Sequence, residues 1–287
     1  MPTAPRAPRR APVLLLLLLA APAHSTLAQD APPVQPLQGQ ELHPWTLRFE
    51  PAAWYPAASG EIRMPGADSD DLEVADLNLD SPRLSPAGEL HFRRDRWRIT
   101  AEAFDFSTSN RGAVMTDSGA FGTLDFTEGD RLSSSLDLTN ISLQGAYRLR
   151  LDEAGVTLDG GTRLRSSIFA VGGARFLDVE AGAELDGTSI SRSAIAAHPL
   201  AGLRWELDIW EEFAVDLLMA GGYFPAGNNS SYSFDILVGF AWNPTPALGA
   251  QIGYRQLLFE IQDGEGVDEF NWQGGLAGVY AGAVLRF

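Results

Sequence analysis

The sequence predicts an all-β fold: a closed antiparallel transmembrane β-barrel of ten strands, with eight or twelve strands as the alternatives. The first observation is that apolar residues alternate with polar or small ones over segments of about ten residues, the length of a tilted strand that crosses a bilayer. The second is that no stretch after the first 28 residues approaches the roughly 18 consecutive apolar residues of a membrane-spanning helix. The third is an alternating C-terminal segment that ends on an aromatic residue.

This C-terminal segment, residues 271–287 (NWQGGLAGVYAGAVLRF), has the pattern of a strand that closes a barrel. Every second position counted back from Phe287 is apolar: Leu285, Ala283, Ala281, Val279 and Ala277. The intervening positions hold Arg286, Val284, Gly282, Tyr280 and Gly278. Because successive side chains of a strand point to opposite faces, one face can meet lipid while the other, small and partly polar, lines an interior.

The N-terminus has the pattern of a cleaved signal peptide. A basic region (Arg6, Arg9 and Arg10) precedes an apolar region at 13–20 and a small-x-small cleavage site at 26–28. The apolar region is too short to span a bilayer as a helix. The chain is therefore predicted to contain a signal peptide (1–28), a Pro-rich lead-in (29–44) and a barrel domain (45–287).

Composition excludes several classes of function. The chain has no Cys, so it has no disulfide, no lipid anchor on Cys and no thiolate metal site. It has no Lys, and removal of the signal peptide leaves 18 Arg against 37 acidic residues, a formal charge of −19. Such acidity argues against nucleic acid or an anionic membrane surface as a partner.

The C-terminal half shows the alternation most clearly. In the segment 232–242 (YSFDILVGFAW), Ile236, Val238 and Phe240 lie on the predicted outward face, and Asp235 and Gly239 on the inward face. The strands predicted in this half are 199–207, 213–223, 232–242, 248–258 and 271–287.

The N-terminal half follows the same rule less regularly. Near Asn140 and Asp178 the apolar set changes face, which we interpret as two β-bulges. The strands predicted in this half are 45–54, 84–93, 96–106, 136–151 and 167–184. Ten is an even number, as a chain that begins and ends in the periplasm requires.

The predicted connections alternate in length, as in barrels with short periplasmic turns and long external loops. The longer, external ones are 55–83, 107–135, 185–198, 224–231 and 259–270. The short ones are 94–95, 208–212 and 243–247. The segment 152–166 is the exception, and part of a strand could be hidden in it.

Residues 45–287 resemble the superfamily of small outer-membrane β-barrel proteins of Gram-negative bacteria. The resemblance rests on the architecture, on the terminal Phe287, and on the fragments 171–176 (VGGARF) and 253–255 (GYR). It implies residence in the outer membrane. It also implies that the barrel assembly machinery recognises the C-terminal strand. It implies no reaction, ligand or cofactor.

Charged residues of both signs fall on predicted inward positions. In a narrow lumen such charges are expected to pair, because few waters are available to solvate them. We interpret the set as a salt-bridge network that closes the lumen, with a gated polar pore as the alternative. The predicted network consists of Arg48, Glu50, Glu89, Arg98, Glu102, Arg148, Arg150, Arg175, Arg204, Glu206, Asp216, Asp235, Arg255 and Arg286.

Aromatic residues on the outward face are expected to form belts at the two membrane interfaces rather than ligand cages. These are Trp45, Trp205, Phe213, Tyr232, Trp242, Tyr254 and Phe287.

Two acidic segments, 67–80 (ADSDDLEVADLNLD) and 264–269, offer oxygen ligands of the kind that Ca²⁺ and Mg²⁺ prefer. The first lacks the Gly and the final Glu of an EF-hand loop. We therefore interpret both as solvated acidic loops and predict no metal site and no cofactor.

Signals for catalysis are sparse. After the signal peptide only His43, His91 and His198 remain, and none has a Ser or Asp at a spacing typical of acyl transfer. His198, placed at the external mouth, is the one candidate for a hydrolase at the outer rim. No catalytic residue is predicted.

Three hypotheses of function follow. The first is a structural or surface-interaction barrel with a closed lumen, which contacts outer-membrane lipid and lipopolysaccharide, the latter through shared divalent cations. The second is a small porin or a conduit for small or apolar solutes. The third is the outer-rim hydrolase.

Overall fold

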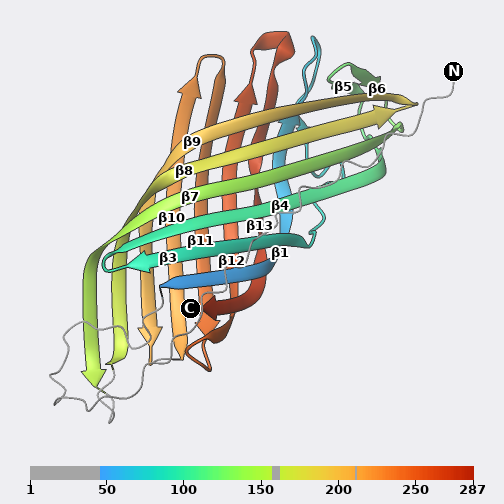
Figure 1. The fold of residues 1–287 in the computed structure, drawn as a ribbon. Helices are drawn as coiled ribbons and strands as arrows, with labels where there is room; N and C mark the ends of the chain where they lie inside the picture. The colour runs from blue at the N-terminus through green and yellow to red at the C-terminus, as the bar shows by residue number, and fades with distance from the viewer. Residues whose placement is uncertain (1–45, 157–161, 211) are drawn as a thin grey trace. The chain divides into compact units, whose positions relative to one another are not determined.

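A ring of ten antiparallel strands forms the barrel (Figure 1). The computed structural model describes residues 46–287 except 157–161 and 211, and it describes no side chain from 156 to 163. The predicted signal peptide, lead-in and Trp45 therefore lie outside the described residues. The ring strands are β1 (Leu47–Arg63), β3 (Ser85–Arg94), β4 (Trp97–Val114), β7 (Arg131–Val156), β8 (Thr162–Leu185), β9 (Thr188–Ile209), β10 (Phe213–Ala226), β11 (Asn229–Trp242), β12 (Leu248–Asp263) and β13 (Phe270–Arg286).

The ring closes between its first and last strands. β1 pairs with β13 from Arg48 opposite Arg286 to Arg63 opposite Asn271. The backbone N–H of Phe287 donates to the carbonyl of Leu47 at 2.8 Å. The prediction of a closed ten-stranded barrel is confirmed. We call the end at Leu47 and Phe287 the terminus end and the opposite end the loop end.

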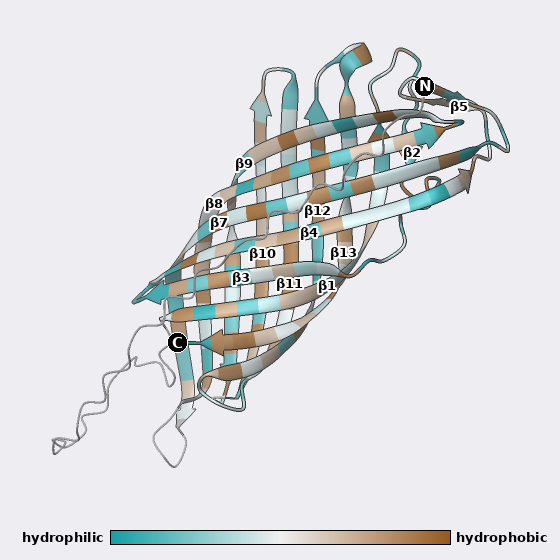
Figure 2. Cartoon of the chain, turned by 45° about the vertical axis from the view of Figure 1, so that its right-hand side comes forward, coloured by the Kyte–Doolittle hydropathy of each residue, from teal (hydrophilic) through white to brown (hydrophobic). Residues whose placement is uncertain are grey.

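Hydrophobic and hydrophilic residues alternate along the strands (Figure 2), and successive side chains of a strand point to opposite faces of the wall. In β11, Val238 points outward and is 44% exposed, while Asp235 points into the lumen and is fully buried. Apolar residues gather on the outward face because a strand in a bilayer must meet acyl chains at every second position.

The bulges predicted near Asn140 and Asp178 are wrong. Pairing of β7 with β8 runs without a shift past Asn140 opposite Leu177 and Thr139 opposite Asp178. The register shifts lie instead between Asn110 and Ala113 in β4 and between Arg148 and Arg150 in β7.

The apolar set does change face near Asn140, but without any change of register. Towards the loop end the outward positions of β7 become polar, with Thr139 and Asp137, while the inward Leu138 and Leu136 are fully buried. Here the outward face of the strand lies beyond the apolar band, and its inward face lies in an apolar part of the lumen. The sequence pattern therefore inverts as it would at a bulge.

Strands run farther past the apolar band than predicted, which shortens several external connections. The segment 185–198, predicted as a long loop, belongs mostly to β8 and β9, which are joined by the two-residue turn Asp186-Gly187. Both turn residues have positive φ, 50° and 83°, as a type I′ hairpin requires. The connection predicted at 224–231 also shrinks to two residues, because β10 ends at Ala226 and β11 begins at Asn229.

Two long connections remain at the loop end, residues 64–84 and 115–130. They carry the short strands β2 (Leu72–Glu73), β5 (Gly119–Phe121) and β6 (Leu124–Phe126). A single 3₁₀ turn, η1 (Gly266–Asp268), precedes β13, and none of the described residues forms a helix long and apolar enough to cross a membrane.

The segment 152–166 holds no additional strand among its described residues. β7 continues to Val156 and β8 begins at Thr162. Because β7 and β8 both extend into this segment, the predicted connection was longer than the other connections at that end.

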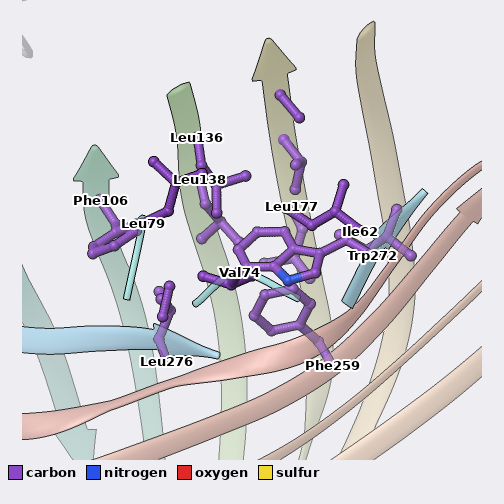
Figure 3. Packing of buried hydrophobic residues seen from close by; sticks show 14 of the residues in the cluster. Ile62, Val74, Leu79, Phe106, Leu136, Leu138, Leu177, Phe259, Trp272 and Leu276 are labelled. Atoms are coloured by element: carbon purple, nitrogen blue, oxygen red, sulfur yellow. The ribbon is translucent and has the colours of Figure 1, made fainter. Parts of the chain in front are cut away.

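The segment 64–84 folds into the loop-end half of the lumen, where it forms what we call the apolar plug (Figure 3). Its Val74, Leu77 and Leu79 are at most 1% exposed. The N–H of Val74 donates to the Gly60 carbonyl at 2.8 Å, and the hydroxyl of Ser134 donates to the Leu77 carbonyl at 3.0 Å. The barrel side chains that pack with this segment include Ile62, Phe106, Leu136, Leu138, Leu177, Phe259, Trp272 and Leu276.

The interpretation of 67–80 as a solvated acidic loop is therefore wrong for its apolar residues. The carboxylates, such as those of Asp71 and Asp76, are exposed, but Leu72 and the plug residues are buried. Burial of apolar area releases water and outweighs the acidity of the segment as a whole.

Candidate functional site: the charged lumen

The terminus-end half of the lumen is lined by ionised side chains in two connected clusters. The first, the central cluster, is built around Arg255 of β12. Its Nη2 lies 2.5 Å from Asp235 Oδ2 on β11 and 2.6 Å from Glu102 Oε1 on β4, so one guanidinium joins opposite parts of the wall. Arg175 of β8 also pairs with Asp235, at 2.5 Å.

Polar groups complete the central cluster. The amide of Asn140 donates to Glu102 at 3.0 Å, and Arg175 donates to the hydroxyl of Ser233 at 3.1 Å. The carboxylates therefore accept several charge-assisted bonds, which offsets the cost of burying them.

Arg255 also contacts the first aromatic rings of the apolar half. Its Cζ lies 5.6 Å from the ring centroid of Trp54 and 5.3 Å from that of Phe104. The two rings meet edge to face at 4.9 Å. A cation over an aromatic face is attracted by the ring quadrupole, so Arg255 joins the charged half of the lumen to the apolar half.

The second group, the terminus-end cluster, lies between Arg255 and the end of the barrel at Leu47 and Phe287. Arg204 of β9 pairs with Asp216 of β10, and Arg98 of β4 pairs with Glu206 of β9. Glu206 also accepts from Arg93 at 2.9 Å. Arg48 also pairs with Glu50 on β1.

Glu50, Glu89 and His91 are the group of described residues whose ligand atoms approach closely enough for a metal ion. Nε2 of His91 lies 3.4 Å from Glu50 and 3.3 Å from Glu89. Its Nδ1 accepts from the guanidinium of Arg98, with Nη2 at 3.1 Å. A neutral imidazole that accepts at Nδ1 carries its proton on Nε2, where a metal would need a lone pair. The arrangement therefore suits a proton between the two carboxylates better than a metal ion.

The prediction that His198 lies at the external mouth is wrong. It is 2% exposed and points into the lumen. Its Nε2 lies 2.6 Å from the Ser233 hydroxyl, and its Nδ1 lies 3.1 Å from that of Ser231. A Ser–His contact of this kind can serve catalysis only where substrate can reach it. His198 lines neither of the lumen cavities described below.

The structure places most of the predicted lumen residues inside the barrel. Those in the two clusters are Arg48, Glu50, Glu89, Arg98, Glu102, Arg175, Arg204, Glu206, Asp216, Asp235 and Arg255. Arg148 is half-buried near the bulge of β7, and Arg286 lines a cavity at the terminus end.

The prediction that Arg150 belongs to the lumen network is wrong. It is exposed and pairs at 2.6 Å with Asp152, which is also exposed. The register shift between Arg148 and Arg150 inserts one residue, so the alternation that places Arg148 does not extend to Arg150.

Four titratable lumen residues were missed: His91, Arg93, Arg165 and Asp208. His91 and Arg93 follow Glu89 at steps of two, and Asp208 follows Glu206 in the same way. Continuing the alternation to the end of each strand would have found these three. Nothing in the sequence marks Arg165, because it lies in the segment interpreted as a connection.

Two neighbouring cavities lie in the charged half. The larger, of about 90 Å³, is lined mainly by the terminus-end cluster. The smaller, of about 30 Å³, reaches Trp54, Glu102 and Arg255. The apolar plug and its packing partners are buried together in one cluster in the loop-end half of the lumen.

The predicted belt residues lie on the outward face of the wall. Phe213 is opposite Trp242 near the terminus end of β10 and β11, and Tyr232 is opposite Tyr223 near the loop end. The other predicted members that the structure describes are Trp205, Tyr254 and Phe287. Trp97 and Tyr147, whose rings lie 4.9 Å apart, form an aromatic pair that was not predicted.

A closed ring of antiparallel strands, an apolar outward band and a filled interior define the class of this protein. It is a transmembrane β-barrel of the type that spans bacterial outer membranes.

No protein-family model and no curated protein sequence matches the chain. Solved structures with a similar arrangement of strands include the outer-membrane protease OmpT of Escherichia coli, at 8% identity over 88% of this chain and 100% of that chain, with a TM-score of 0.44. Neisserial surface protein A is similar at 12% identity over 84% and 97% of the two chains, with a TM-score of 0.36. The toluene transporter TodX of Pseudomonas putida is similar at 12% identity over 85% and 91%, with a TM-score of 0.28. At these identities the likeness concerns the fold alone.

Proposed function

We propose that this protein is an integral outer-membrane barrel with a closed lumen and a structural or surface-interaction role. The observation that carries the proposal is that two different barriers lie in series along the barrel axis. The paired charges around Arg255 form one, and the apolar plug forms the other.

The two barriers oppose permeation for different reasons. A hydrated ion that enters the charged half must compete with guanidinium–carboxylate pairs that already satisfy one another. An ion that enters the apolar half would lose its hydration among side chains such as Leu77 and Trp272, which offer it little in exchange. A conformational change that opened one half would leave the other closed.

The wall beyond the apolar band supports a role at the cell surface. One row of paired residues on β4, β7 and β8 is apolar on its outward side, with Ala103, Ile141 and Phe176. The next row towards the loop end holds Asp105, Thr139 and Asp178, and the row after that holds Ser107, Asp137 and Glu180. The outward surface therefore changes from apolar to acidic within two residues of each strand.

We propose that the carboxylates at that boundary lie at the level of the lipid headgroups. We propose that they share divalent cations with the phosphates of lipopolysaccharide, since hard oxygen ligands favour Mg²⁺ and Ca²⁺. A second proposed partner is the barrel assembly machinery, which would recognise β13 through its outward apolar face and Phe287.

Planar-bilayer recording tests the closed lumen. We expect the purified barrel to show at most small, infrequent conductance steps. Large and steady conductance from the unmodified protein would contradict the proposal and favour a porin.

Variants separate the two barriers. One replaces residues 67–80 by a Gly-Ser linker, and the other combines Arg204→Ala with Arg255→Ala. Because the barriers act in series, each variant alone should conduct little, and only their combination should open the lumen. Altered migration in unboiled SDS samples serves as the control for folding of each variant.

A conduit for apolar solutes is the second candidate, and one observation favours it. β3 is shorter than its neighbours, so beyond Trp54 no ring strand lies between β1 and β4. Arg83 spans this break, with its N–H bonded to the Pro56 carbonyl at 3.0 Å and its Nε to the Thr108 hydroxyl at 3.4 Å. Displacement of the segment 64–84 would open this break and connect the apolar half of the lumen to the exterior. Saturable binding of an apolar fluorescent dye, abolished by Leu79→Asp, would favour this candidate over the first.

A further inference from the structure

The larger lumen cavity, at the terminus end, has a balanced charge. Five arginines and five carboxylates line it. Arg204 with Asp216, Arg93 with Glu206, and Arg48 with Glu50 account for three of each as direct pairs. Glu89 faces His91 at 3.3 Å.

Two of the lining charges differ from these. Asp208, near the end of β9, and Arg286, near the end of β13, line the cavity from different strands. Among the described residues, neither is joined to another side chain by a hydrogen bond or an ion pair, and Nε of Arg286 is buried without an acceptor. The cavity therefore presents one carboxylate and one guanidinium that form no hydrogen bond or ion pair with another described side chain.

Asn243 supplies a third group. It lines the same cavity and is only 5% exposed, and its Oδ1 has no donor among the described residues. Its backbone N–H is fixed by the Glu212 carbonyl at 2.6 Å. A Cβ at Gly249 would lie 2.3 Å from Asn243 Oδ1, so glycine at that position leaves room for the amide.

We propose that this cavity binds a small zwitterion of the amino-acid type from the terminus end. The ammonium group donates to the carboxylate of Asp208 and to Oδ1 of Asn243, and the carboxylate accepts from the guanidinium of Arg286. Each unused group then has a partner of the opposite kind, which is the condition for burying polar groups at low cost.

The charge balance selects the class of ligand. A simple cation or anion would add one net charge to a lining whose formal charges cancel, and the added charge would lack a counter-charge in a space of low dielectric. A zwitterion adds none. The volume of about 90 Å³ is several times the 10–15 Å³ or so that one water requires, so it admits a molecule of a few heavy atoms.

Equilibrium dialysis of isotope-labelled L-alanine against the purified, folded barrel tests the proposal. We expect saturable binding. Acetate and methylammonium, which carry the two halves of the zwitterion separately, should each bind about tenfold more weakly or worse, because each leaves one charge of the site unpaired. Asp208→Asn and Arg286→Gln should each weaken L-alanine binding by a similar factor.

Matched controls carry the same chemical changes at exposed positions of the same end. Asp95→Asn lies in the β3–β4 turn at φ 55°, a conformation that Asn tolerates, and Arg94→Gln is exposed beside it. Both should bind L-alanine as the unmodified barrel does. Gly249→Ala should weaken binding by pushing the amide of Asn243 away.

Three outcomes would overturn the proposal. The first is the absence of saturable L-alanine binding, and the second is binding of acetate or methylammonium as tight as that of L-alanine. The third is binding of L-alanine by the Asp208→Asn and Arg286→Gln variants as tight as by the unmodified barrel. All variants must keep the altered migration of a folded barrel in unboiled SDS samples, so a loss of folding is distinguished from a loss of the site.

Discussion

Cζ of Arg255 lies 5.3 Å from the ring centroid of Phe104, and this contact joins the charged and the apolar halves of the lumen. The same guanidinium bonds Asp235 at 2.5 Å. Removal of Arg255 would therefore disturb both halves.

We expect Arg255→Ala to lower the free energy of unfolding by about 3–5 kcal/mol, because it leaves buried carboxylates without their cation. Urea unfolding in lipid vesicles, followed by tryptophan fluorescence, measures the change. The matched control is Arg150→Ala, whose guanidinium is exposed, and its effect should stay within about 0.5 kcal/mol. Equal effects of the two substitutions would show that the central cluster contributes nothing to stability.

The register of β11 predicts opposite responses at adjacent positions. Val238 points outward, so Val238→Arg should cost about 2–4 kcal/mol if this residue meets acyl chains near the middle of the membrane. Spin labels at 236, 238 and 240 should be accessible to oxygen dissolved in lipid, and labels at 235, 237 and 239 should not. The reverse pattern would mean that the strand is shifted by one residue.

Gly239, the inward neighbour of Val238, is constrained by the lumen instead of the lipid. A Cβ at this position would lie 2.5 Å from the hydroxyl oxygen of Tyr280. Gly239→Ala should therefore destabilise the barrel through displacement of that side chain, by about 1–3 kcal/mol. A stability unchanged by the substitution would show that the Tyr280 side chain moves away at no cost.

Substitution of Leu77, which lies in the acidic segment that forms the apolar plug, is expected to lower the free energy of unfolding strongly. Leu77 is 1% exposed among the lumen side chains, so Leu77→Ala should cost about 2–5 kcal/mol. The neighbouring Asp76 is exposed, and Asp76→Ala serves as the control with little expected effect. Limited proteolysis adds a second measurement, since cleavage within 64–84 should become faster in the Leu77 variant alone. Equal cleavage in both variants would mean that the plug is not held by its apolar contacts.

Closure of the ring between β1 and β13 predicts resistance to detergent. Because every ring strand is paired on both sides, the barrel should stay folded in SDS until it is boiled. Unboiled and boiled samples should therefore migrate differently on the same gel. Identical migration, together with release of the protein in a soluble fraction, would contradict the membrane-barrel interpretation.

The sequence alone indicated ten strands, the membrane-crossing part of each, and the face that the residues of the strands in the C-terminal half present. The reason is that lipid requires an apolar side chain at every second position of a spanning strand, and this period is visible without knowledge of neighbours. The pattern at 232–242 places Val238 outside and Asp235 inside without reference to β10 or β12.

The tertiary structure alone decided how the lumen is filled. Arg255 joins Glu102 and Asp235, which are far apart in sequence, and no spacing in the chain indicates which of the inward charges meet across a barrel. The structure also decided that Leu77 of an acidic segment is buried, because a connection can enter the lumen only where the surrounding strands leave an apolar space. Alternation is a local property of each strand, whereas lumen contacts depend on which strands face each other once the ring has closed.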